Sequence, residues 1–275
     1  MISMWIDSIK KRTSTRTYDQ RPLESSIKRE ILDYLNSTTG PFGAKVKFYL
    51  VNIEDSSNKK LGTYGVIKSA KNFIAAVTEK KEPRSLEQLG YVLEKGILYA
   101  TSLGLGTCWL AGTFKRQEFI NTIELKEEEE LPVITPIGYP RDKRSVVDSF
   151  MRFAAGSNNR KDFKELFFEG SWNNEVNQKD KKYIQALEML RLAPSASNKQ
   201  PWRVLVDNEK FHFYLARNKG YGEGLGYDVQ KIDIGIAMCH FELTMQELGF
   251  KGKWKEDNPK KDKESCEYII SFIIE

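Results

Sequence analysis

The chain has 275 residues, of which 40% are hydrophobic and 29% are charged, and its formal net charge is +5. This length predicts two modules, or one large fused module, with a hydrophobic core of ordinary size. The mild excess of positive charge suits a small anionic ligand. Because Lys and Arg are interleaved with Asp and Glu, no nucleic-acid partner is expected; such a partner usually needs a clustered basic stripe.

Cysteine and histidine usage excludes two further classes of protein. The three cysteines show no C-x-x-C spacing, and only two histidines are present. This pattern argues against a disulfide framework or a metal centre and favours a reducing compartment. The N-terminus lacks the apolar region of a signal peptide, and no run reaches the length of a membrane span. We therefore expect a cytoplasmic protein with no metal and no membrane contact.

In chain order, the first half predicts helices alternating with short apolar strands. Apolar periodicity indicates helices over residues 2–10, 24–36 and 86–103. Short apolar runs indicate strands over residues 47–51, 73–77 and 132–138. Gly104 and Gly106 follow the third helix and are suitable C-cap residues for it.

Residues 145–180 have little periodicity and predict a connector over the surface, with a short helix near residues 160–168. Beyond them, the pattern predicts helices over residues 181–192 and 232–248, and strands over residues 202–206, 211–215 and 268–273. We expect a first half over residues 1–150, a connector over residues 151–180 and a second half over residues 181–275.

The two halves share marker residues at a constant offset of 145. Glycines and a tryptophan recur in matching positions: Gly90, Gly104 and Trp109 in the first half, and Gly235, Gly249 and Trp254 in the second. Shared leucines on two amphipathic helices would be weak evidence by themselves. Glycines and tryptophans matched at one offset favour a degenerate internal duplication.

The spacing Arg12-x-Ser14-x-Arg16 is the first candidate for a binding motif. Alternate residues of an extended backbone share a face, so two guanidiniums and a hydroxyl can converge on one anion such as a phosphate monoester. Taken alone, this spacing is better explained as an exposed basic loop after a helix.

Two further candidates lie later in the first half. The segment 104–112 is rich in glycine, which lets a backbone N–H approach a ring nitrogen of a ligand. A helix C-cap explains its first two glycines but leaves Gly112 unexplained. Arg141 and Arg144 follow a predicted strand, where they could join a phosphate site, although an ordinary basic turn explains them equally well.

The segment 193–202 is the most specific motif of the chain. Its sequence, Ala-Pro-Ser-Ala-Ser-Asn-Lys-Gln-Pro-Trp, combines a helix stop, a turn with small hydroxyl residues, two side-chain amides and an apolar strand. Such a turn offers hydroxyl, amide and backbone groups to a flat heteroaromatic ligand. A purely structural loop rarely needs so many polar groups beside a tryptophan.

Together these four patterns resemble the FMN-dependent nitroreductase family, in particular its fused, two-halved members, over most of residues 8–144 and 183–254. The resemblance implies an α+β fold of two pseudo-symmetric halves, each with a mainly antiparallel sheet packed with helices. Family members are usually homodimers with two FMN sites at the subunit interface. Here the Arg-x-Ser-x-Arg motif occurs only in the first half and the Pro-Ser turn only in the second. This division implies a monomer that acts as an internal pseudo-dimer with one complete flavin site.

By motif position, the resemblance also implies the residues of that site. The FMN phosphate would be held by Arg12, Ser14 and Arg16, assisted by Arg144 and Arg141. The ring and ribityl chain would be lined by Pro194, Ser195, Ala196 and Asn198. Gln200 would either line the ring or only brace the turn. The backbone N–H of Gly112 would face flavin N5; many relatives carry Glu or Gly where Ala111 stands, but a backbone donor is insensitive to that change.

The implied activity is reduction by way of the flavin. NAD(P)H would pass a hydride to flavin N5, and a nitroaromatic, quinone or similar small electron acceptor would then take electrons from the same face. Two alternatives stay open: FMN-dependent reduction of another class, such as dehalogenation or enone reduction, and flavin binding without turnover.

Three single residues have structural interpretations. We expect Cys108 to be a buried hydrophobic residue rather than a reactive thiol, His240 to be a hydrogen-bonded core residue, and Trp202 to pack in the core behind the ligand.

Overall fold

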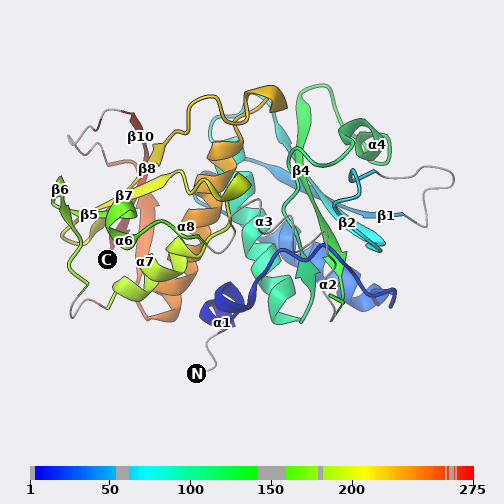
Figure 1. Cartoon of the computed structure of the whole chain (residues 1–275), viewed down its shortest axis with the longest axis horizontal. Helices are drawn as coiled ribbons and strands as arrows, with labels where there is room; N and C mark the ends of the chain where they lie inside the picture. The colour runs from blue at the N-terminus through cyan, green and yellow to red at the C-terminus, as the bar shows by residue number, and fades with distance from the viewer. Residues whose placement is uncertain are drawn as a thin grey trace.

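The computed structural model describes residues 4–53, 62–141, 159–178, 182–257, 259, 263 and 265–275. Two β-sheets lie on either side of a central pair of long helices, α3 (Ser85–Ser102) and α8 (Val229–Glu247) (Figure 1). One sheet comes from the first half of the chain and the other from the second half. The expected α+β class with two halves is therefore confirmed.

The first sheet is antiparallel and has the strand order β1-β2-β4-β3. Its strands are β1 (Val46–Asn52), β2 (Asn72–Glu79), β3 (Gly106–Thr107) and β4 (Glu129–Gly138), and the other helices of this half are α1 (Met4–Lys11), α2 (Ser25–Ser37) and α4 (Arg116–Ile120). Seven consecutive residues of β2 are buried because the strand has a core on each face. Ile74 packs into the larger core with α3 and α8, whereas Phe73 packs into a separate cluster on the opposite face.

The second sheet has the strand order β6-β5-β7-β8-β10-β9 and is antiparallel except between β5 and β7. Its strands are β5 (Phe167–Glu169), β6 (Ser171–Glu175), β7 (Trp202–Asp207), β8 (Lys210–Ala216), β9 (Gly252–Lys255) and β10 (Cys266–Ile274), and the other helices of this half are α6 (Phe163–Leu166), α7 (Ile184–Arg191) and the short 3₁₀ turns η1 (Ala196–Asn198) and η2 (Glu223–Leu225). Trp202 is fully buried at the start of β7, as expected.

The helices and strands predicted from apolar patterns are present within a few residues of their expected bounds. The interpretation of residues 163–175 as a surface connector is wrong. Leu166 and Phe167 are fully buried, and β5 pairs in parallel with β7. Because the apolar run is too short to show a period and its partner strand lies 37 residues later, the sequence pattern of this segment gives no sign of the pairing.

The contact between α3 and α8 is reciprocal. A Cβ atom at Gly90 would lie 2.2 Å from the carbonyl oxygen of Ile232, and one at Gly235 would lie 2.0 Å from that of Glu87. Gly90 and Gly235 differ by 145 positions, and so do Glu87 and Ile232. The same pair of positions thus meets twice, which is the pattern of a two-fold interface between equivalent helices.

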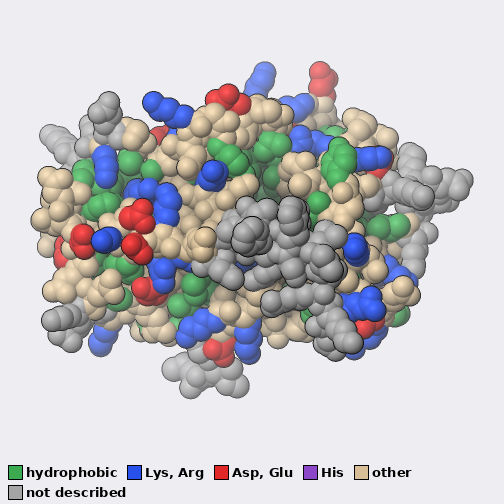
Figure 2. Space-filling view, viewed as in Figure 1, with side chains coloured by type: hydrophobic (Ala, Val, Ile, Leu, Met, Phe, Trp, Pro, Cys, Tyr) green, Lys and Arg blue, Asp and Glu red, His purple; other side chains and the backbone are tan. Residues whose placement is uncertain are grey.

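The distribution of surface charge and the character of the helices can be compared with the expectation of no nucleic-acid or membrane partner. On the face shown in Figure 2, basic side chains lie beside acidic ones with hydrophobic side chains scattered between them. Within the described part of the chain, no helix combines the length and the apolar character that crossing a membrane requires.

Candidate functional site

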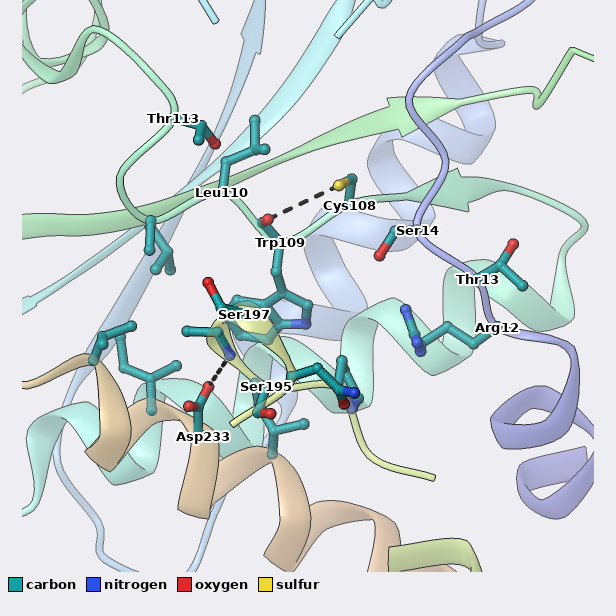
Figure 3. A pocket seen from close by; sticks show the side chains of 18 of the residues that line it. Arg12, Thr13, Ser14, Cys108, Trp109, Leu110, Thr113, Ser195, Ser197 and Asp233 are labelled. Carbon is teal, nitrogen blue, oxygen red and sulfur yellow. Dashed lines mark hydrogen bonds between the residues drawn. The ribbon is translucent and has the colours of Figure 1, made fainter. Parts of the chain in front are cut away.

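A cavity of about 500 Å³ lies where segments of both halves meet (Figure 3). Its walls come from the segment after α1, the segment after β3, the turn before β7 and the N-terminal half of α8. Nine of the residues predicted as site residues line it: Arg12, Ser14, Arg16, Ala111, Gly112, Pro194, Ser195, Ala196 and Asn198. Residues up to 186 positions apart in the sequence are therefore brought together.

The segment after α1 runs beside β3. Ser14 forms a parallel bridge with Thr107, and the backbone N–H of Thr15 donates to the carbonyl oxygen of Thr107 at 2.8 Å. Gly106 permits this approach, since a Cβ there would lie 2.6 Å from Oγ1 of Thr15. The sequence interpretation of Gly106 as a C-cap is thus wrong, whereas Gly104 has the left-handed φ of +75° that suits the end of a helix.

Arg12 is held near a buried carboxylate. Its Nε atom lies 3.9 Å from Oε1 of Glu94, and both side chains are almost fully buried. Glu94 also accepts a hydrogen bond from the indole N–H of Trp109 at 2.7 Å and lies 2.8 Å from Nε2 of His240. The other ring nitrogen of His240 lies 3.0 Å from the carbonyl oxygen of Met189. His240 is therefore the hydrogen-bonded core residue that was expected.

Arg160 brings a further guanidinium to the cavity, from the segment predicted as a connector. It donates hydrogen bonds to Oδ1 of Asn198 and, at 3.0 Å, to the carbonyl oxygen of Leu192. Burial, together with the positive charges of Arg12 and Arg191, lowers the pKa of Arg160 to about 10. Among the described residues no carboxylate forms an ion pair with Arg160, so the arginines on this side of the cavity favour an anionic ligand.

The turn before β7 holds three non-glycine residues at positive φ: Ser197 at +46°, Asn198 at +55° and Gln200 at +50°. Gln200 stabilises this costly conformation. Its side-chain amide donates to the carbonyl oxygens of Asn159 and Asn198, and its Oε1 accepts from the backbone N–H of Lys161. Gln200 is buried and does not line the cavity. Gln200 therefore braces the turn through its side-chain hydrogen bonds.

Asp233 of α8 supports the same turn from below. Its Oδ1 atom accepts a hydrogen bond from the backbone N–H of Ala196 at 2.9 Å, which Figure 3 marks. The side chain is almost fully buried and lines the cavity. Burial raises the pKa of Asp233 to about 8.

The loop that carries Ala111 and Gly112 is anchored by two side chains. Arg116 and Tyr227 both donate hydrogen bonds to the carbonyl oxygen of Ala111, at 3.2 and 3.4 Å, and Tyr227 comes from the second half. Gly112 is exposed at the cavity and packs close to Leu225, since a Cβ would lie 3.2 Å from its side chain. The neighbouring Cys108 is buried, as expected for a structural cysteine.

A comparison with protein-family models gives one match, which spans residues 5–245 and has the description "Putative TM nitroreductase". The chain belongs to this nitroreductase family. The resemblance seen in the motifs is confirmed, and the family supports an oxidoreductase as the class of enzyme. No curated protein matches the chain.

Several solved structures of nitroreductases are similar to this chain. A "putative nitroreductase" from Thermotoga maritima is 20% identical in sequence, covers 98% of this chain and 93% of its own, and has a TM-score of 0.64. A nitroreductase with bound FMN from Bacteroides fragilis is 18% identical, covers 52% of this chain and 91% of its own, and has a TM-score of 0.42. The Thermotoga structure shows that the nitroreductase-like fold extends over both halves of the chain.

Two of the predicted site residues, Arg141 and Arg144, are not among the described residues that line the cavity. Arg141 is exposed, and its backbone N–H donates to the carbonyl oxygen of Thr17 at 3.1 Å, but it does not line the cavity. Arg144 lies outside the described residues. Conversely, Arg160, Asp233 and Arg116 were missed by sequence reasoning. In the sequence, nothing distinguishes Asp233 from other charged residues of α8 such as Lys231 and Glu242.

Proposed function

We propose that the chain is an FMN-dependent oxidoreductase that uses NAD(P)H to reduce a nitroaromatic, a quinone or a similar small electrophile. One observation carries the proposal: the Arg12–Arg16 segment of the first half and the Pro194–Asn198 turn of the second half line the same cavity. Membership in the nitroreductase family supports the class of reaction.

The residues that line the cavity suit FMN, because they offer positive charge for its phosphate and an apolar surface for its ring. Arg12, Arg16 and Arg160 are cations for a phosphate, and the Nε atom of Arg12 is buried without a hydrogen-bond partner among the described residues. The turn at 194–198 and the apolar residues Val229, Ile232 and Ile236 offer a surface for a flat ring. A volume of about 500 Å³ lies in the range of small-molecule and cofactor sites.

In this assignment each group of residues has a separate task. Arg12, Ser14, Arg16 and Arg160 bind the phosphate, and the turn at 194–198 positions the ring from the second half. The backbone N–H of Gly112 donates towards flavin N5, and Arg116 holds the loop that presents it. A bound flavin supplies the hydride-transfer chemistry, so no side-chain nucleophile is required.

We further propose one flavin per chain, in a monomer that acts as an internal pseudo-dimer of residues 1–150 and 181–275 joined by residues 151–180. Each half has a tryptophan that donates to a glutamate of its long helix, Trp109 to Glu94 and Trp254 to Glu242. The first-half turn at 37–43, however, has no Asn or Gln, and a Cβ at Gly40 would lie 2.7 Å from the Gln88 side chain. That turn packs against α3 and lacks the polar groups of its counterpart.

The test is to purify the protein, measure flavin per chain by visible absorbance, and mix it anaerobically with NADH and with NADPH. About one FMN per chain, bleached by at least one nicotinamide and reoxidised by a quinone or nitroaromatic, is the expected result. A protein that binds no flavin overturns the proposal. A bound flavin that neither nicotinamide reduces shows a flavin-binding protein without turnover.

A further inference from the structure

Asp233 has one carboxyl oxygen that the fold leaves without a partner. Its Oδ1 atom accepts from the N–H of Ala196, whereas its Oδ2 atom is buried and has no hydrogen-bond partner among the described residues. The side chain is only 2% exposed and belongs to the wall of the cavity (Figure 3). A buried polar atom normally has a partner, so a ligand in the cavity is the natural candidate for it.

Bracing the turn does not by itself require an acid. Gln88 stands 145 residues before Asp233, at the equivalent place on α3. Its Oε1 atom accepts from the backbone N–H of Phe42, also at 2.9 Å, and so supports the turn of the first half. An amide oxygen is therefore sufficient for the brace. The acid, Asp233, occurs only in the second half, and it is the turn of this half that lines the cavity.

Burial favours the protonated form of the carboxyl group at this position. Burial raises its pKa, the N–H of Ala196 opposes this effect and the negative charge of Asp228 adds to it, and the net result is a pKa of about 8. Because Oδ1 accepts a hydrogen bond, a proton on this carboxyl group would reside on Oδ2. Among the described residues, the other charged and titratable groups that line the cavity are Lys10, Arg12, Arg16, Cys108, Arg160 and Tyr221. Asp228 and Lys231 lie near Asp233 at the start of α8, and Glu87 and Glu94 lie on the neighbouring helix α3. Asp233 forms an ion pair with none of the described cations.

We propose that Asp233 is a flavin-binding residue that acts as a neutral acid, donating a hydrogen bond from Oδ2 to a carbonyl oxygen or ring nitrogen of the flavin. This inference rests on the proposed function. A neutral acid is a donor, whereas an ionised carboxylate would place a negative charge against an electron-rich acceptor atom. Binding of the ring is therefore coupled to a proton, and it weakens once Asp233 ionises.

The test uses the apoprotein and riboflavin, which lacks the phosphate and so isolates the ring. Its dissociation constant is measured by fluorescence between about pH 6 and pH 9 for wild type, Asp233→Asn and Asp233→Ala. Wild-type affinity should fall by up to about tenfold per pH unit above about pH 8. Asp233→Asn keeps an oxygen for Ala196 and an N–H donor for the ring. It should bind about as tightly as the wild type at low pH, without the pH dependence.

Asp233→Ala should bind weakly at every pH, and thermal unfolding verifies that each variant is folded. The matched control is Asp228→Asn, which removes a neighbouring carboxylate outside the cavity wall while an asparagine can still cap α8. It should keep the pH dependence, with the midpoint at a lower pH, because the charge of Asp228 contributes to the raised pKa of Asp233. Infrared difference spectra of the apoprotein give a second readout, because a protonated carboxyl band should be present at pH 7, lost near pH 9 and absent from Asp233→Asn.

The outcomes separate the inference from the proposed function. Wild-type binding that does not change with pH, an Asp233→Asn variant as weak as Asp233→Ala, or no protonated carboxyl band at pH 7 each overturns the role of Asp233 and leaves flavin binding intact. A wild-type apoprotein that binds neither riboflavin nor FMN at any pH overturns the proposed function, and this inference with it.

Discussion

The guanidinium of Arg160 donates a hydrogen bond to the side-chain oxygen of Asn198 and so joins a cation to the turn that lines the cavity. A second hydrogen bond, to the carbonyl oxygen of Leu192 at 3.0 Å, fixes the side chain at the end of α7. Arg160 is therefore placed to contact an anion and to support the turn at the same time. These two roles can be separated by the choice of ligand.

Arg160→Gln should weaken FMN more than riboflavin, because only FMN carries the phosphate. Loss of a charge-assisted hydrogen bond costs about 1.5–3 kcal/mol, which corresponds to an FMN dissociation constant roughly 10- to 100-fold higher. The riboflavin constant should change little. Arg191→Gln is the matched control, since Arg191 pairs with Glu188 and does not line the cavity. An equal loss of affinity for FMN and for riboflavin would show that Arg160 only supports the turn and does not bind the phosphate.

Arg16→Glu should abolish retention of FMN during purification, because it places a negative charge against the phosphate. The measurement is the ratio of flavin to protein absorbance after gel filtration. Arg141→Glu makes the same change of charge at an exposed position outside the cavity and should retain its flavin. If Arg16→Glu purifies with a full complement of flavin, the Arg12–Arg16 segment is not the phosphate site.

Asn198→Ala should raise the dissociation constant of the flavin by about tenfold, on the scale of one lost hydrogen bond plus backbone strain. Asn198 accepts from Arg160, and its side-chain N–H donates to the carbonyl oxygen of Asn159. Asn208→Ala is a suitable control: Asn208 has the same φ of +55° in the turn between β7 and β8 and does not line the cavity. An unchanged flavin affinity for Asn198→Ala would rule out a binding site shared between the halves.

Apolar patterns were sufficient to predict most of the fold, because strands such as β2 and helices such as α3 have long, regular patterns of their own. The motif residues were predicted by their spacing. Arg160 and Asp233 could not be found in this way. Arg160 reaches the cavity through contacts with Asn198 and Leu192, more than 30 residues away, and Asp233 becomes unusual only once α8 is buried on every side. Such roles depend on tertiary contacts that no local pattern encodes.

Asp233 should make the stability of the apoprotein fall as the pH rises. The pKa of this carboxyl is raised from 3.8 to about 8, so between these values the folded chain binds more protons than the unfolded chain. The stabilisation is complete below about pH 4 and is lost as the pH approaches 8. Relative to wild type, Asp233→Asn should therefore gain unfolding free energy over this interval, by about 6 kcal/mol at most. Urea unfolding at pH 5 and pH 8 measures the difference; parallel changes in both proteins would contradict it.

Gly235→Ala should destabilise the pairing of the two halves. On an exposed helix this substitution would gain up to about 1 kcal/mol in helix propensity. Here the added methyl group would lie 2.0 Å from the carbonyl oxygen of Glu87, a backbone atom that cannot rotate away, so α3 and α8 must separate. Overpacking of this kind costs about 1–3 kcal/mol or more, which calorimetry would detect as a lower Tm. Gly224→Ala is the control, because a Cβ there meets no atom within 4 Å. Equal melting temperatures for the two variants would contradict the prediction. They would show that α3 and α8 can accommodate the added methyl group and that the pairing of the halves does not depend on Gly235.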